Sequence, residues 1–149
     1  MSKLRLAKQR IDNRQNFRVS GRNPLDVKVL RCRAHRAIGG RRFSAVTEDI
    51  SVTGIRFRGP IELSDGVALK LLVHLAYDSQ KYRLQGVVQW CRAVPDSEEL
   101  WEVGVGLLDS TSRANRNWTR AVYDIIRSRS QVTHIDSLLQ PPSPRRFFR

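Results

Sequence analysis

The sequence predicts an all-β-dominated protein: a six-stranded antiparallel β-barrel with a C-terminal α-helix and a flexible basic N-terminal arm. Six largely apolar or alternating stretches are separated by short turn-like segments, which is typical of an antiparallel sheet or small barrel. A later stretch changes to helical spacing. The chain has 149 residues, enough for one domain to close a single core without disulfides or metal.

The strands follow from period-two patterns bounded by turn signals. The first, LDVKVLRCR, places Leu25, Val27 and Val29 on one face. Gly-Gly, Asp-Gly, Asp-Ser and Pro-Asp pairs mark turns between strands. Gly104 and Gly106 interrupt the last strand, and we expect them to allow the sharp bends that a small barrel needs. The predicted strands are residues 25–33, 43–50, 53–59, 67–77, 82–94 and 100–109.

The stretch after the last strand, residues 110–130, has the spacing of one apolar helical face. Trp118, Val122 and Ile125 belong to that face, and Ser112 is a candidate N-cap. We expect this helix to plug or cover one end of the barrel. The predicted organisation is a basic arm over residues 1–23, a barrel with its helix over 24–129, and a flexible Pro- and Arg-rich tail over 130–149.

The chain is strongly basic. It has 27 Lys and Arg against 14 Asp and Glu, a formal net charge of +13. This indicates an anionic partner: nucleic acid, a nucleotide, an acidic protein or an anionic membrane. The first 23 residues carry seven basic residues and one acid, with few apolar residues. We therefore expect an arm that is disordered until it binds a ligand.

Other classes of protein lack support in the sequence. Cys32 and Cys91 form no C-x-x-C pair, and we interpret both as reduced. The histidines have no metal-ligand spacing. The first residues lack the apolar segment of a secretory signal, and no run reaches the ~20 apolar residues of a membrane span. We expect a cytoplasmic protein that does not insert into membranes.

No catalytic motif is complete. GIRFRGPI has the glycine spacing of a phosphate-binding loop but lacks its Lys, and GVGLLD lacks the third glycine of a dinucleotide fingerprint. No G-x-S-x-G sequence occurs. We expect a protein that is not an enzyme and uses no metal or cofactor.

The stretch EDISVTGIRF crowds polar residues into an apolar strand pattern. Buried polar atoms need partners, because an unpaired one costs ~1–3 kcal/mol. Either the backbone turns here and uses Asp49 and Ser51 itself, or a ligand uses them. Upstream, Arg14 and Arg18 lie four residues apart. An R-x-x-x-R pair followed by D-x-S-x-x-G resembles the PilZ domain family, and GVVQWCR and VGVGLLD are similar to its later strands, over about residues 10 to 128.

The resemblance implies a PilZ-like barrel that binds cyclic diguanylate (c-di-GMP). Arg14 and Arg18 would clasp guanine and phosphate, because an Arg fork matches the guanine O6 and N7 acceptors. Asp49 would accept from guanine N1–H and N2–H₂, and Ser51 would offer a hydroxyl. Gly54 would let the backbone turn and approach the ligand closely.

Three further features of the sequence have more than one interpretation. Arg10 precedes Arg14 by the same four-residue step and is a third ligand candidate, for a phosphate or a second ligand molecule. Trp90 is either a core residue or, as in some family members, an aromatic near a guanine. The basic hairpin 31–42 either binds a partner or keeps a sheet edge soluble.

The functional prediction is a bacterial c-di-GMP receptor or adaptor. Ligand binding would order the arm against the barrel and alter a surface for an unidentified protein partner. The resemblance implies outputs in motility, exopolysaccharide synthesis or virulence. One alternative is a nucleic-acid-binding module that uses the basic surface. The other is a PilZ-like protein adaptor that has lost ligand binding.

Overall fold

The structure is a computed structural model. It describes residues 17–30, 36–97, 99–108 and 112–139, and in residues 130–139 it describes the backbone only. Arg14, Arg10, Cys32 and most of the predicted arm and tail lie outside the described residues.

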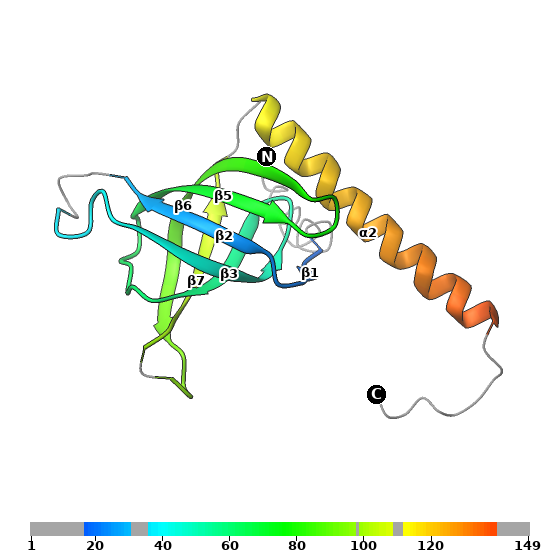
Figure 1. Ribbon diagram of the computed structural model, residues 1–149, viewed down its shortest axis with the longest axis horizontal. Helices are drawn as coiled ribbons and strands as arrows, with labels where there is room; N and C mark the ends of the chain where they lie inside the picture. The colour runs from blue at the N-terminus through cyan, green and yellow to red at the C-terminus, as the bar shows by residue number, and fades with distance from the viewer. Residues whose placement is uncertain (1–16, 31–35, 98, 109–111, 140–149) are drawn as a thin grey trace, which may run out of the picture.

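The strands form one closed antiparallel barrel, as the sequence predicts (Figure 1). Six strands pair in the order β3-β2-β5-β6-β7-β4, and β4 pairs back onto β3 to close the ring. A short seventh strand, β1, which the sequence analysis did not predict, adds to the open side of β3. The elements are β1 (Val19–Ser20), β2 (Pro24–Val29), β3 (Arg42–Ile50), β4 (Gly54–Gly59), β5 (Ala68–Leu75), β6 (Gln80–Ala93), β7 (Trp101–Leu107) and α2 (Arg113–Leu139).

The barrel core follows the period-two pattern of the strands. Leu25, Val27 and Val29 of β2 are all buried, and the residues between them point outward. Ile55 and Phe57 of β4 are buried in the same way. Burial of each such side chain stabilises the fold by roughly 1.5–3 kcal/mol. Because the apolar residues alternate with polar ones, this energy also decides which face of each strand points into the barrel and which points outward.

Helix α2 covers the barrel next to β1 and β6. Its start is capped as predicted, because the Asn115 amide donates to Ser112 Oγ at 3.2 Å. Trp118 and Val122 are buried against the strands, and Tyr82 of β6 meets the Trp118 ring edge-on at a centroid distance of 5.5 Å. The helix continues to Leu139, beyond the boundary predicted at residue 129. In the described part of the chain, no helix is long and apolar enough to span a membrane.

The end of the predicted arm belongs to the barrel. Val19 is buried, and β1 pairs with the end of β3. Asn23 is 6% exposed, its side-chain Oδ1 accepts from the Ala76 backbone N–H at 2.9 Å, and its own backbone N–H donates to Thr47 Oγ1 at 2.9 Å. Residues 17–23 are therefore attached to the sheet, and this attachment positions Arg18.

Candidate functional site

The polar stretch in the middle of EDISVTGIRF is a tight connection between two antiparallel strands. β3 ends at Ile50 and β4 begins at Gly54. The Ser51 amide donates to the Gly54 carbonyl at 2.8 Å, and the Gly54 amide donates to Ser51 Oγ at 3.0 Å. Ser51 is only 1% exposed. Its hydroxyl is therefore hydrogen-bonded within the turn. This matches the interpretation in which the backbone turns here and uses the polar side chains itself.

The same turn is held against β7 and α2. Trp118 Nε1 donates to the Ser51 carbonyl at 3.1 Å. A Cβ on Gly54 would lie 3.0 Å from the Val105 carbonyl oxygen, closer than side chains normally approach. Glycine at this position lets the turn lie against the neighbouring strand. The position of the motif is thus set by parts of the chain distant in sequence.

Asp49 binds two arginines. A β-bulge between Thr47 and Asp49 shifts the register so that Asp49 lies opposite Arg56 of β4. Asp49 Oδ2 accepts from Arg56 Nε at 3.1 Å and Nη2 at 2.7 Å, and Oδ1 accepts from Arg18 Nη1 at 3.0 Å. With Asp49 only 6% exposed, its carboxylate holds two guanidinium groups in place at the surface.

The ion pairs continue across β7. Arg56 Nη1 donates to Glu102 Oε2 at 2.7 Å, and Arg92 Nε donates to Glu102 Oε1 at 3.0 Å. The Arg92 guanidinium lies over the Trp90 ring, 5.2 Å from its centroid, in a cation–π contact. The hydrogen bonds that Arg56 donates to Asp49 are the largest cause of the raised pKa of Arg56, so this guanidinium is held in its charged form. We call Arg18, Asp49, Arg56, Glu102 and Arg92 the ion-pair chain.

Arg18 and Arg92 are the two exposed ends of the ion-pair chain, and Arg18 is the end that lines a cavity over β4, β6 and β7. The strand that follows Arg18 is fixed on both sides: Val19 pairs with Ile50, and Arg129 of α2 donates to the Ser20 carbonyl at 2.8 Å. The Arg18 side chain nevertheless remains 58% exposed. It therefore presents guanidinium N–H groups to solvent from an anchored backbone.

A second bulge shapes the neighbouring surface of β6. It lies between Val88 and Trp90, and it leaves Gln89 and Trp90 both exposed on the outside of the barrel. A Cβ on Gly104 would lie 2.2 Å from Trp90 Cε2, and one on Gly106 would lie 2.2 Å from Gln89 Nε2. The glycines of β7 thus make room for two side chains that lie across it. The interpretation of Trp90 as a core residue is wrong, because it is 37% exposed.

These side chains border a cavity of about 410 Å³ over β4, β6 and β7. Arg18, Arg56, Gln89 and Trp90 all line it. The predicted site residues fall into three groups: Arg18, Gly54 and Trp90 line the cavity, Asp49 and Ser51 hold its walls, and Arg14 and Arg10 lie outside the described residues.

Sequence reasoning missed Arg56, Gln89, Glu102 and Arg92. Arg56 alternates with two buried residues of β4, a pattern that indicates an outward side chain. Its partners could be found only from the register, which places Asp49 of β3 directly opposite Arg56 and Glu102 of β7 two positions away from the residue opposite it. No pattern in the sequence indicated that Gln89 belongs to the site, since its exposure depends on the bulge.

The cavity has the chemical groups needed to bind an anion and an aromatic ring. It offers guanidinium donors, a side-chain amide and an exposed indole face. Such groups bind phosphate and guanine edges and stack on purines. Among the described residues, no group of three or more His, Cys, Asp or Glu side chains is arranged to hold a metal ion.

Comparison with known proteins gives a consistent assignment of fold. The PilZ domain family model matches residues 12–124. No curated protein sequence matches the chain. The Bacillus subtilis inhibitor of motility MotI/DgrA is 15% identical with a TM-score of 0.59, and the match covers 78% of this chain and 51% of that one. The PilZ domain with c-di-GMP of YcgR from Escherichia coli is 12% identical with a TM-score of 0.57, and the match covers 80% of this chain and 96% of that one. The K. pneumonia MrkH–c-di-GMP complex is 17% identical with a TM-score of 0.61, and the match covers 78% of this chain and 54% of that one. The alignment thus spans about half the length of the first and third of these proteins.

Proposed function

Because this chain belongs to the PilZ domain family, we propose that it is a c-di-GMP receptor or adaptor, a binding module rather than an enzyme. The observation that carries the proposal is the cavity beside the D-x-S-x-x-G turn, where Arg18, Arg56 and Trp90 converge. Two of the similar structures are described as containing c-di-GMP, which agrees with this choice of ligand.

The exposed groups of the cavity match the parts of the ligand. Arg18 would bind a guanine edge or a phosphate, since its fork of N–H groups fits paired oxygen and nitrogen acceptors. Trp90 would stack on a guanine, and its ring lies next to Gly104, where a side chain would displace it. The Gln89 amide lies beside it over Gly106 and can donate to and accept from the ligand.

Asp49 and Ser51 would act through other groups. Asp49 binds Arg18 and Arg56 at 3.0 and 2.7 Å, so it would orient the guanidinium that meets the ligand. Ser51 closes the turn that brings Gly54 to the cavity wall. Direct contact of either side chain with guanine stays a prediction, and the observed contacts favour the positioning roles.

The segment before β1 would complete the site. Arg14 precedes the anchored Arg18 by four residues, and Arg10 precedes Arg14 by the same step. We propose that both bring guanidinium groups to the ligand and that ligand binding orders the N-terminal arm against the barrel. The changed surface would then act on a protein partner. An output in motility is suggested by the similar inhibitor of motility. Exopolysaccharide synthesis, virulence and a cytoplasmic location stay predictions.

Calorimetric titration of c-di-GMP into wild type, Arg18→Ala and Arg22→Ala tests the proposal. Arg22 is a matched control, because it is an exposed arginine four residues away that does not line the cavity. We expect selective binding by wild type over GTP and cyclic di-AMP. Arg18→Ala should weaken binding by about tenfold or more, equivalent to ~1.4 kcal/mol, with Arg22→Ala close to wild type.

Two results would contradict the assignment. If wild type ignores c-di-GMP at about tens of micromolar, the chain is a member of the family that does not bind this ligand. If both alanine variants weaken binding equally, attraction comes from overall charge and the cavity is not the site.

A further inference from the structure

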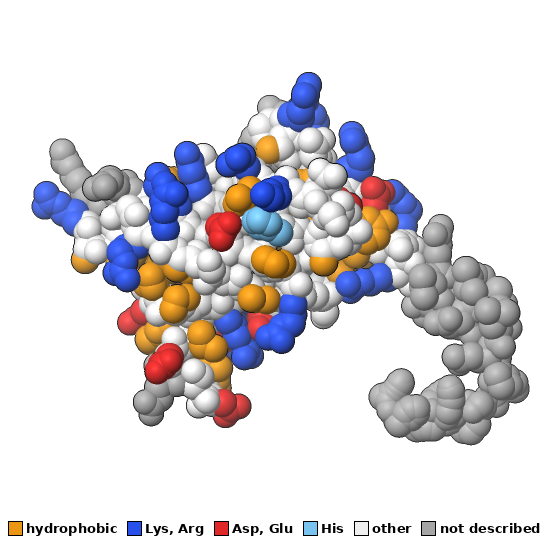
Figure 2. Space-filling model, viewed as in Figure 1, with side chains coloured by type: hydrophobic (Ala, Val, Ile, Leu, Met, Phe, Trp, Pro, Cys, Tyr) orange, Lys and Arg blue, Asp and Glu red, His pale blue; other side chains and the backbone are white. Residues whose placement is uncertain are grey.

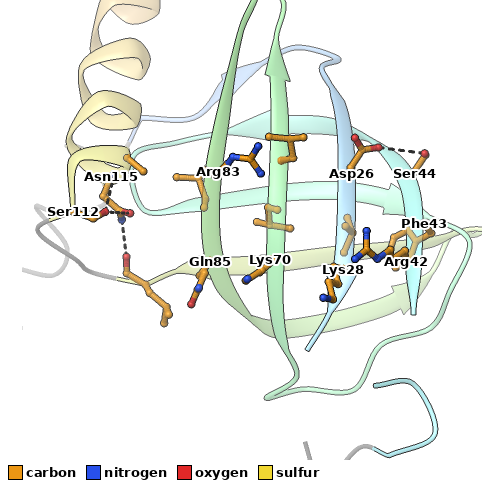
Figure 3. A pocket seen from close by; sticks show the side chains of 16 residues that line it. Asp26, Lys28, Arg42, Phe43, Ser44, Lys70, Arg83, Gln85, Ser112 and Asn115 are labelled. Carbon is orange, nitrogen blue, oxygen red and sulfur yellow. Dashed lines mark hydrogen bonds between the residues drawn. The ribbon is translucent and has the colours of Figure 1, made fainter. Parts of the chain in front are cut away.

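The wall of the barrel opposite the motif carries a larger cavity, of about 1000 Å³. It begins at the start of α2 and crosses the outer faces of β6, β5, β2 and β3 (Figure 3). In the strand order, β2 and β5 are separated from β4 and β7 by β3 on one side and β6 on the other. Neither Trp90 nor any residue of the ion-pair chain lines this cavity, and of its described lining residues Leu108 alone also borders the smaller cavity.

Three cations lie side by side across this wall. Lys28 of β2 pairs with Arg42 of β3 on one side and with Lys70 of β5 on the other. All three point outward and line the cavity. We call Arg42, Lys28 and Lys70 the cationic row. Like charges directly opposite one another on neighbouring strands destabilise a sheet, so the arrangement is unfavourable in the protein alone.

The cationic row has no neutralising partner within the described part of the chain. Among the described residues, no carboxylate lies within ion-pair distance of Arg42, Lys28 or Lys70. The nearby acid, Asp26, instead contacts His74 Nε2 at 3.4 Å. Arg83 adds a fourth cation to the cavity lining. Figure 2 shows Lys and Arg side chains spread over this side of the molecule.

Apolar groups accompany the charges. Leu72 is half-buried beside the cationic row, and Leu108 is 43% exposed at the end of the cavity near α2. A phosphate backbone makes little use of apolar surface, whereas a protein segment with acidic and apolar side chains uses both kinds of contact. The cavity lining also lacks an exposed aromatic platform for stacking nucleotide bases.

We propose that this wall docks an acidic amphipathic helix of a partner protein, with its carboxylates on the cationic row. Neighbouring strands lie about 4.8 Å apart, so the row presents a positive charge at about that interval. Glutamates three and four residues apart on a helix recur about every 5–6 Å. A helix that crosses the strands therefore brings one carboxylate to each cation and its apolar side chains to Leu72 and Leu108.

The probe is a fluorescein-labelled synthetic helix of about 18 residues with a stripe of Glu three and four apart and Leu beside it, at about 0.15 M salt. A scrambled peptide of equal composition is the peptide control. Fluorescence anisotropy compares wild type, K28Q/K70Q and R22Q/R120Q. Both double variants lose two positive charges, but Arg22 and Arg120 do not line this cavity. We expect K28Q/K70Q to weaken binding by about tenfold or more and R22Q/R120Q by less than about twofold.

A second measurement needs no partner. Lys28→Glu changes two repulsive cross-strand pairs into attractive ones, so it should raise the melting temperature by about 2–4 °C while it abolishes peptide binding. A lower melting temperature, or equal losses in the two double variants, would overturn the inference. So would a DNA duplex that displaces the peptide and depends on Lys28 and Lys70, because the wall would then bind nucleic acid. None of these outcomes depends on c-di-GMP binding.

Discussion

Replacing Gly104 with Ala tests how the cavity is built, because it moves Trp90 without changing Trp90 itself. The added Cβ would lie 2.2 Å from Trp90 Cε2 and 2.3 Å from Nε1. No packing tolerates such distances, so the indole must leave β7. The ring can shift toward solvent, since it is 37% exposed. Gly104 is not among the residues with positive φ, so alanine itself fits the strand backbone.

The expected effect on stability is small. Displacing the ring removes the cation–π contact with Arg92, worth about 0.5–1 kcal/mol at an exposed site. Replacing a strand glycine with alanine recovers about 0.5–1 kcal/mol of backbone entropy. These contributions oppose each other, so the free energy of unfolding should change little. Ligand binding should lose a stacking contact of ~1–3 kcal/mol, or about 5- to 160-fold in affinity.

The assay is a double-mutant cycle of c-di-GMP titrations with wild type, G104A, W90A and G104A/W90A. We expect G104A to weaken binding about as much as W90A and to add nothing in the W90A background, since no ring is left to displace. Gly21→Ala is the control, because its added Cβ would meet atoms only at 3.6 and 3.8 Å. Wild-type affinity in G104A, or additive losses in the double variant, would refute the stacking role of Trp90.

Two further predictions concern the turn and the thiol. Ser51→Ala leaves the buried Gly54 amide without its side-chain acceptor, so it should lower the free energy of unfolding by ~1–3 kcal/mol, as measured by urea titration. Thr53→Ala, at the exposed position of the same turn, should change this free energy little. Equal effects of the two substitutions would contradict the role of the hydroxyl. Burial raises the pKa of the Cys91 thiol, so in a Cys32→Ser background iodoacetamide should modify Cys91 more slowly in the folded than in the unfolded chain at about pH 8. The folded state then holds a proton that the unfolded state releases, so the contribution of Cys91 to stability should fall as pH rises above about 8.5, and a rise over this range would show the opposite shift.

Local patterns in the sequence were enough to predict most of the fold. Alternation in β2 placed Leu25, Val27 and Val29 inside, and the structure confirms all three as buried. The Ser112 cap and the buried Trp118 face of α2 are also confirmed. These features depend on interactions between residues a few positions apart, or on one face of one element, and such patterns are visible in a linear sequence.

The sequence alone determined the barrel, its helix, the basic charge and the family motif. Only the tertiary structure decided that Asp49 binds Arg56, that Trp90 lies outside the barrel over Gly104, and that Lys28 meets two further cations. The physical reason is register. Two bulges and the closure of the ring decide which outward residues of different strands become neighbours, and a shift of one residue would turn each side chain to the other face.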